Sequence, residues 1–205
     1  MTFKEFARQH LDLKTIRIFN VKDLSDLKGI SEFEGSTTLQ IGECQDLTSI
    51  DELPPNIERL EIIKCSSITK ITCKIPDSLK EIQIKWCDKL ESISDCSECN
   101  MFEFDVENCK SLKVLPKLPD LIKYVWLKNS GIEKFADDFD FDLNITNCDF
   151  SKTPIGNKYN LETLTYKENE THFDKLKVLV HLQAGNDLRG AASIMDTGLF
   201  DFKTK

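Results

Sequence analysis

The chain has 205 residues, 40% of them hydrophobic, and a formal net charge of −8 at pH 7. This composition predicts a soluble chain that buries a sizeable core. Because no apolar run approaches the roughly 18 residues of a membrane-spanning helix, we expect no contact with a membrane. The acidic balance repels phosphate backbones, so we expect no nucleic-acid partner.

Residues 1–12 predict a short amphipathic helix that caps the chain. Phe3, Phe6 and Ala7 fall on one face of such a helix, and charged residues lie where a secretory signal needs an apolar stretch. We therefore expect an N-terminal helical cap and a cytoplasmic location.

From residue 13 to residue 170 one pattern returns about every 21 or 22 residues: apolar-x-apolar-x-x-Cys. Its two apolar residues are two apart, which is the period of a strand, so each copy predicts one short strand. The seventh copy, aligned through Leu143, Ile145 and Cys148, ends only 18 residues after the sixth, so an irregularity is expected near residues 136–141. The eight copies end at Val21, Cys44, Cys65, Cys87, Cys109, Ser130, Cys148 and Asn169.

The segments between the strands predict an extended return path. In the first five copies two apolar residues three apart follow the Cys position, as Leu90 and Ile93 do. Later copies have one residue fewer there: Ile132 follows Ser130, and Phe150 follows Cys148. Prolines then begin the return segment, and because proline fixes φ and lacks an N–H, this segment should not be helical.

The segments LPPNIERLEIIKCSSITKI and IPDSLKEIQIKWCDKLESI resemble leucine-rich repeats, with the pattern LxxLxLxxN/CxL. They combine a cysteine-containing subtype with a short proline-containing subtype similar to the repeat domains of secreted bacterial effectors. The resemblance implies an α+β solenoid of about eight turns, with a parallel concave sheet, an extended convex side and helical caps at both ends. It implies little about function.

Five of the eight cysteines occupy the repeated position, where we expect them to be buried, reduced and structural. Cys73, Cys96 and Cys99 lie outside it. We interpret them as reduced thiols, with a zinc site or a labile disulfide as the alternative. A structural zinc site needs four ligands, and no fourth cysteine or histidine lies in register.

The sequence offers no catalytic constellation, so we expect neither an enzyme nor a cofactor or metal. The three histidines, His10, His172 and His181, lie in the expected caps without metal-ligand spacing, and no phosphate-binding glycine loop is present. Residues 171–205 predict a C-terminal helical cap and an apolar tail. The alternative is a tail that docks on a subunit or partner.

The outward positions of the strands are the candidate binding surface. Turns five to seven combine three stacked acids with two neighbouring aromatics, and such aromatics often anchor interfaces. The alternative is an aromatic pair that only shields the sheet. The candidate partner-binding residues are Tyr124, Trp126, Glu103, Asp105, Glu107, Asp142, Asn144, Gln83, Lys85 and Trp86.

The sequence therefore favours a protein-interaction module, an adaptor or inhibitor that binds a basic protein surface through the concave face. One alternative is an assembly subunit that uses its caps and tail. A second is a carbohydrate or small-ligand binder that stacks its ligand on Tyr124 and Trp126. The repeat pattern predicts no particular oligomeric state.

Overall fold

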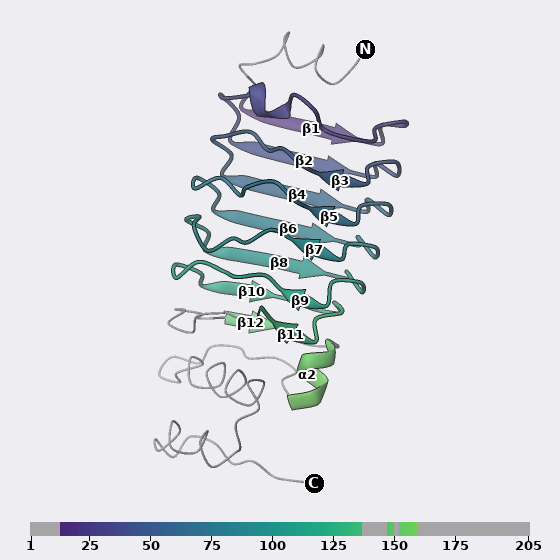
Figure 1. Cartoon of the computed structure of the whole chain (residues 1–205), viewed down its shortest axis with the longest axis vertical. Coiled ribbons are helices and arrows are strands. Elements are labelled where there is room, and N and C mark those ends of the chain that lie inside the picture. Colours follow the sequence, from purple (N-terminus) through teal and green to yellow (C-terminus); the bar gives the residue numbers. More distant parts are fainter. Residues whose placement is uncertain (1–12, 137–146, 150–151, 160–205) are drawn as a thin grey trace.

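The computed structural model describes residues 13–136, 147–149 and 152–159. These residues form a parallel β-solenoid of about 6 turns with repeats of ~22 residues. One strand from each turn joins a seven-stranded sheet in which all neighbours are parallel (Figure 1). Its strands are β1 (Thr15–Phe19), β2 (Thr38–Gly42), β4 (Arg59–Ile63), β6 (Glu81–Lys85), β8 (Glu103–Glu107), β10 (Tyr124–Trp126) and β12 (Asn147–Asp149).

The other side of the solenoid is extended, as the prolines predict. It consists of two-residue strands that form a three-stranded and a two-stranded parallel sheet: β3 (Ser49–Ile50), β5 (Lys70–Ile71) and β7 (Ser92–Ile93), then β9 (Val114–Leu115) and β11 (Lys134–Phe135). The described helical elements are a 3-10 turn, η1 (Ile30–Glu32), and α2 (Pro154–Tyr159). Within the described ranges, none of the helices has the length and apolarity to cross a membrane.

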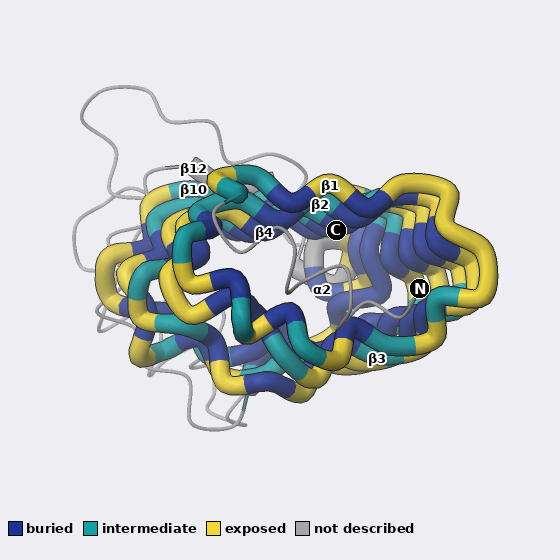
Figure 2. The backbone as a smooth tube through the Cα atoms, turned by 90° about the horizontal axis from the view of Figure 1, so that it is seen from above, coloured by how far each residue is buried: buried dark blue, intermediate teal, exposed yellow. Residues whose placement is uncertain are grey.

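Burial alternates along the strands of the large sheet because successive side chains point to opposite faces. In β6, Ile82 and Ile84 point inward and are fully buried, whereas Gln83 between them is half-buried on the outer face. Parallel register places like residues above one another, so the inward side chains stack into one continuous core (Figure 2). Each buried Ile or Leu contributes about 1.5–3 kcal/mol.

Each strand of the large sheet ends in a left-handed corner. One residue per turn has φ between 53° and 58°. In the first five turns its N–H donates to a carbonyl of the next turn, as Lys64 N–H does to the Lys85 carbonyl at 2.9 Å. Asparagine adopts this conformation readily, whereas the other types are strained by about 1–2 kcal/mol. From the second turn on, the corner directs the next side chain into the core. The corner residues are Asn20, Glu43, Lys64, Trp86, Asn108, Asn129 and Lys152.

The structure corrects the alignment of the seventh copy. Val125 of β10 pairs with Cys148 of β12, so the alignment of Val125 with Leu143 is wrong. The corner of this turn is Lys152, and the buried position after it is held by Thr153, which is 0% exposed. Threonine replaces cysteine here because it is also small and carries a hydrogen-bond donor. The seventh repeat thus ends five residues after Cys148, and the expected 18-residue step does not occur.

The shorter turn after Ser130 is confirmed. The next core residue is Ile132, two positions after Ser130. The following turn has the same spacing, because the core residue Ile155 comes two positions after Thr153. Ile155 N–H donates to the Ile132 carbonyl at 3.0 Å. Gly131 fits the tightened corner because a Cβ there would lie 2.0 Å from the Lys110 carbonyl oxygen. Glycine therefore allows this turn to be one residue shorter than the earlier turns.

Several expectations fall on residues outside the described ranges. These are the caps at 1–12 and 171–205, the eighth copy that ends at Asn169, and most of the expected irregularity, at 137–141. The described strands account for about 6 of the expected eight turns.

Candidate functional site

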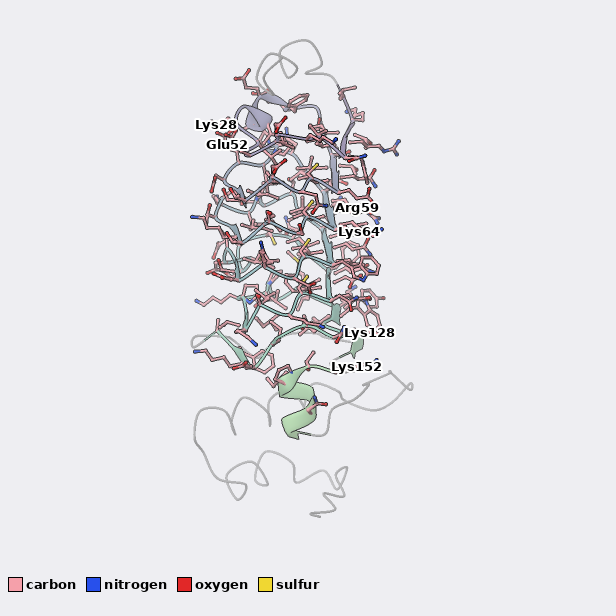
Figure 3. The ribbon with its side chains drawn as sticks, turned by 90° about the vertical axis from the view of Figure 1, so that its right-hand side faces the viewer. Lys28, Glu52, Arg59, Lys64, Lys128 and Lys152 are labelled. Atoms are coloured by element: carbon pink, nitrogen blue, oxygen red, sulfur yellow. The ribbon has the colours of Figure 1, made fainter. Side chains whose placement is uncertain are left out.

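Outward side chains of the large sheet form rows that run from turn to turn. In the first half of the solenoid these rows are paired internally: Arg17 Nε donates to Gln40 Oε1 at 2.8 Å, and Gln40 Nε2 donates to Glu61 Oε2 at 2.7 Å. Arg59, labelled in Figure 3 on the side of the large sheet, bonds to Glu81 at 3.0 Å. Most polar groups of this half therefore satisfy one another.

Asp105, at the centre of β8, departs from the alternation of the sheet. It is only 4% exposed although it lies on the outer face, between the core residues Phe104 and Val106. Its Oδ2 accepts bonds from Lys85 Nζ at 2.8 Å and Gln83 Nε2 at 3.0 Å. Among the described residues, no group donates a hydrogen bond to its Oδ1, which is buried. Leaving such an oxygen unsatisfied costs about 1–3 kcal/mol.

Lys85 is the counter-ion of this carboxylate. Its Nζ also lies 3.4 Å from Glu107 Oε1, so one ammonium group sits between two carboxylates of β8. Burial lowers the pKa of Lys85, but the hydrogen bond and charge of Asp105 and the charge of Glu107 outweigh burial and raise this pKa above its usual value. Lys85 therefore remains charged at neutral pH.

Glu103 lies on the other side of Asp105 along the same strand and is half-buried. Burial, followed by the negative charges of Glu81 and Asp105, raises the pKa of Glu103. Part of this shift therefore comes from the acids that surround Glu103. A cation placed here would be stabilised.

The two aromatic residues lie directly beside these acids. Register pairs Tyr124 with Glu103 and Trp126 with Asp105, so the acids and rings that the sequence assigned to adjacent turns are brought together. Both aromatic residues are half-buried. Their buried part covers the sheet, and the rest is accessible.

The other candidates are distributed differently. Trp86 lies at the corner after β6, 48% exposed, and not on the strand that carries Gln83 and Lys85. Asp142 and Asn144 lie outside the described residues. The places opposite Tyr124 and Trp126, to which the sequence alignment assigned them, belong to Asn147 and Asp149.

The repeated cysteines form a column of thiols inside the solenoid, visible as stacked sulfur atoms in Figure 3. The described members are 0% exposed, and their sulfur atoms lie 3.4–3.8 Å from backbone carbonyl oxygens. Contact with the neighbouring thiol, together with burial, raises the pKa of Cys65 and of Cys87. Such thiols pack as small hydrophobic groups. The described members are Cys44, Cys65, Cys87 and Cys109.

The three cysteines outside this column are also buried free thiols. Burial raises the pKa of Cys73 to about 11 and also raises the pKa values of Cys96 and Cys99. Cys99 Sγ contacts the Cys96 carbonyl oxygen at 3.0 Å. Among the described residues, no three His, Cys, Asp or Glu side chains are arranged to hold a metal ion.

Sequence reasoning identified the acids and aromatics but missed the burial of Asp105 and its pairing with Lys85. The signal was present, because the repeat alignment places Lys85 opposite Glu107. No protein-family model, curated protein or solved structure matches the chain. The geometry of β6, β8 and β10 therefore carries the functional argument.

Proposed function

We propose that this protein is a non-catalytic interaction module that binds a basic protein surface through the outer face of β6, β8 and β10. The observation that carries the proposal is the strand register, which places the two aromatic residues of β10 beside Glu103 and Asp105 on the outer face of β8. The half-buried residues Glu103, Tyr124 and Trp126 provide the accessible groups, and the buried Asp105 adds negative charge beside them. We name Glu103, Asp105, Tyr124 and Trp126 the acid–aromatic patch.

We further propose that the solenoid is of the leucine-rich-repeat type and that its large sheet is the concave side. The ~22-residue period, the one-strand-per-turn parallel sheet and the small residue buried after each strand from β2 onward support this assignment. A sheet of this kind is a rigid platform, and rigid elements hold binding groups more accurately than loops do.

Charge and residue type both favour a basic protein as the partner. The net charge of −8 attracts positively charged proteins over a distance of about 8–10 Å at physiological ionic strength. At closer range Tyr124 and Trp126 supply apolar area at little entropic cost, which is the usual role of aromatic residues at interface centres.

The test is an affinity capture from source-cell extract on the immobilised full chain. A Tyr124→Ala/Trp126→Ala variant removes both aromatic anchors, and a Lys70→Ala/Ser92→Ala variant serves as the control on the opposite sheet. We expect the wild type and the control to retain the same basic protein, and the patch variant to lose it.

Two results would contradict this function. In the first, the patch variant retains its partner as well as the wild type does. In the second, deletion of residues 197–205 abolishes the capture while the patch variant has no effect. The second result would favour the assembly-subunit alternative, in which the C-terminal tail makes the contact.

A further inference from the structure

The left-handed corners of the solenoid lie above one another and form an exposed edge. We call this surface the corner edge and define it, in each turn, as the residue before the corner residue, the corner residue and the three residues after it. The strand arrows of Figure 1 point to this edge, and Figure 3 views the molecule from that side. Neighbouring strands are about 4.8 Å apart, so the edge is roughly 29 Å long from the first corner to the seventh.

Exposed apolar side chains gather on the corner edge. Among the described residues, the exposed large hydrophobic residues are Phe19, Val21, Trp86 and Leu121. The first three belong to this edge, and they are between 41% and 49% exposed. Isolated exposed apolar residues are ordinary, but a grouping on one edge favours a contact surface.

Trp86 is the most informative of these residues. Its φ of 57° places a bulky side chain in the left-handed conformation, which asparagine adopts more readily at the next two corners, Asn108 and Asn129. The fold gains little from the ring in return, because Trp86 is 48% exposed. Strained residues are concentrated at functional sites, so this exposed tryptophan indicates a contact outside the chain.

The two ends of the corner edge differ in charge. Asp23 and Asp46, at turns one and two, are exposed, and among the described residues no cation forms a salt bridge with either. Lys22 is exposed beside Asp23 and offsets part of this negative charge. Lys128 and Lys152, at turns six and seven, are exposed and labelled in Figure 3, and no carboxylate in the described ranges pairs with them.

Between these ends the charges of the edge are paired or mixed. Lys64 pairs with Glu43 at 3.5 Å, and Lys85 pairs with Glu107 at 3.4 Å. The other charged residues of turns four and five include both signs and are Asp88, Lys89 and Lys110. The difference in charge therefore lies at the two ends, with Trp86 between them.

The position of Trp86 makes the edge complementary to itself. Trp86 is the fourth of the seven corner residues. If a second copy is rotated by 180° about an axis through this corner, Asp46 of one copy faces Lys128 of the other, and Asp23 faces Lys152. A two-fold interface uses the same surface on both copies, so each of these charge pairs occurs twice and the two Trp86 side chains meet at the axis.

We propose that two copies of this chain associate through the corner edge in antiparallel orientation, with Trp86 at the two-fold axis. The corner edge shares no residue with the acid–aromatic patch, so this association goes beyond the proposed function. A parallel arrangement is disfavoured because it places Asp46 against Asp46 and Lys128 against Lys128. One narrow edge buries less than the roughly 1,600 Å² of a standard interface, so we expect a weak dimer with a Kd of about 10–100 μM.

Sedimentation velocity of the full chain, over concentrations from about 5 to about 500 μM, measures this equilibrium. We expect monomer at the lowest concentration and mostly dimer at the highest in about 50 mM salt. Because salt screens exposed charges, about 500 mM salt should weaken the association at least about fivefold.

Trp86→Asn tests the centre of the interface. Asparagine suits the left-handed corner, so this variant should fold at least as well as the wild type. It should weaken the dimer at least about tenfold, because the central aromatic anchor is removed. A dimer of unchanged affinity in this variant would overturn the proposal.

A charge swap tests the orientation. Asp46→Lys and Lys128→Glu should each weaken the dimer at least about fivefold, because like charges then face each other. An equimolar mixture of the two variants should form a dimer at least as tight as the wild type, since every contact between positions 46 and 128 then joins opposite charges. Lys70→Glu is the matched control, because it reverses an exposed charge of β5 on the opposite side of the solenoid, and it should dimerise like the wild type.

A chain that remains monomeric at about 500 μM in low salt would overturn the proposal. Single charge variants whose mixture fails to restore the dimer would also overturn it. Asp46 accepts a hydrogen bond from the Asp23 N–H at 3.0 Å, so Asp46→Lys can fail to fold. Lys128→Glu then decides by itself: it must weaken the dimer more than Lys70→Glu does, and equal affinities would refute the antiparallel contact.

Discussion

Replacing Cys87 with aspartate tests whether the thiol column lies in a dry core. Cys87 is 0% exposed, and its side chain contacts the Cys109 thiol and a backbone carbonyl oxygen. A carboxylate there loses its hydration and gains no cation, and burial of this kind raises the pKa of a carboxyl by about 3 units or more. At about 1.36 kcal/mol per unit, Cys87→Asp should lower the free energy of unfolding by about 4 kcal/mol at pH 7.

The pH dependence of this loss has a definite sign. The pKa of the new carboxyl is raised in the folded state, so the destabilisation is present above the unfolded pKa of about 4 and shrinks as the pH falls through the folded pKa. With a folded pKa near 7, lowering the pH from 7 to 6 should restore about 1 kcal/mol. Both values lie above the isoelectric point of about 5.0.

Urea unfolding followed by circular dichroism measures these free energies, with Cys87→Asn as the matched control. Asparagine has the shape of aspartate without its charge. Its cost should be smaller and independent of pH. If the Asp and Asn variants are equally stable at pH 7, position 87 is reached by water and the assignment of a dry column is wrong.

Three further predictions test the turns of the solenoid. Gly131→Ala should lower the free energy of unfolding by about 2–3 kcal/mol, because the added Cβ meets the Lys110 backbone. Gly42→Ala is the control and should cost less than about 1 kcal/mol, because its Cβ meets only the exposed ring of Phe19. Equal losses in thermal unfolding would refute the tight sixth corner. Lys64→Val should lower the free energy of unfolding by about 1–2 kcal/mol, because valine is strained at this left-handed corner, whereas Lys64→Asn should leave it unchanged. Urea unfolding measures both, and an unchanged free energy for the valine variant would contradict the corner geometry. In a Cys148→Ser variant, a thiol reagent should find no fast-reacting group before denaturant is added; rapid reaction of any thiol would show that the seven described cysteines are not protected.

The strands could be predicted because their pattern depends on local periodicity. Residues such as Ile82 and Ile84 alternate with polar neighbours, and from β2 onward the small buried residue after each strand returns at a nearly constant interval. The seventh turn was misaligned because Cys148 imitates the repeated cysteine, while the true equivalent, Thr153, differs in residue type. Only the strand register distinguishes them.

The composition of the candidate site could be predicted, but its energetics could not. Alignment of the repeats places Tyr124 opposite Glu103 and Trp126 opposite Asp105, as the structure does. The burial of Asp105 depends on how its neighbours in adjacent turns cover it, and its pairing depends on how far Lys85 reaches. These features arise from side-chain conformations in three turns, which periodicity does not encode.

The affinity of the captured partner for the Trp126→Ala variant tests the central claim most directly. Calorimetric titration should show a loss of about 2 kcal/mol of binding free energy, or roughly 30-fold in Kd, because a central aromatic anchor is removed. The thermal midpoint of the variant should change little, since Trp126 is half-buried on the outer face and lies outside the core. Unchanged affinity in a folded Trp126→Ala protein would contradict binding through the acid–aromatic patch.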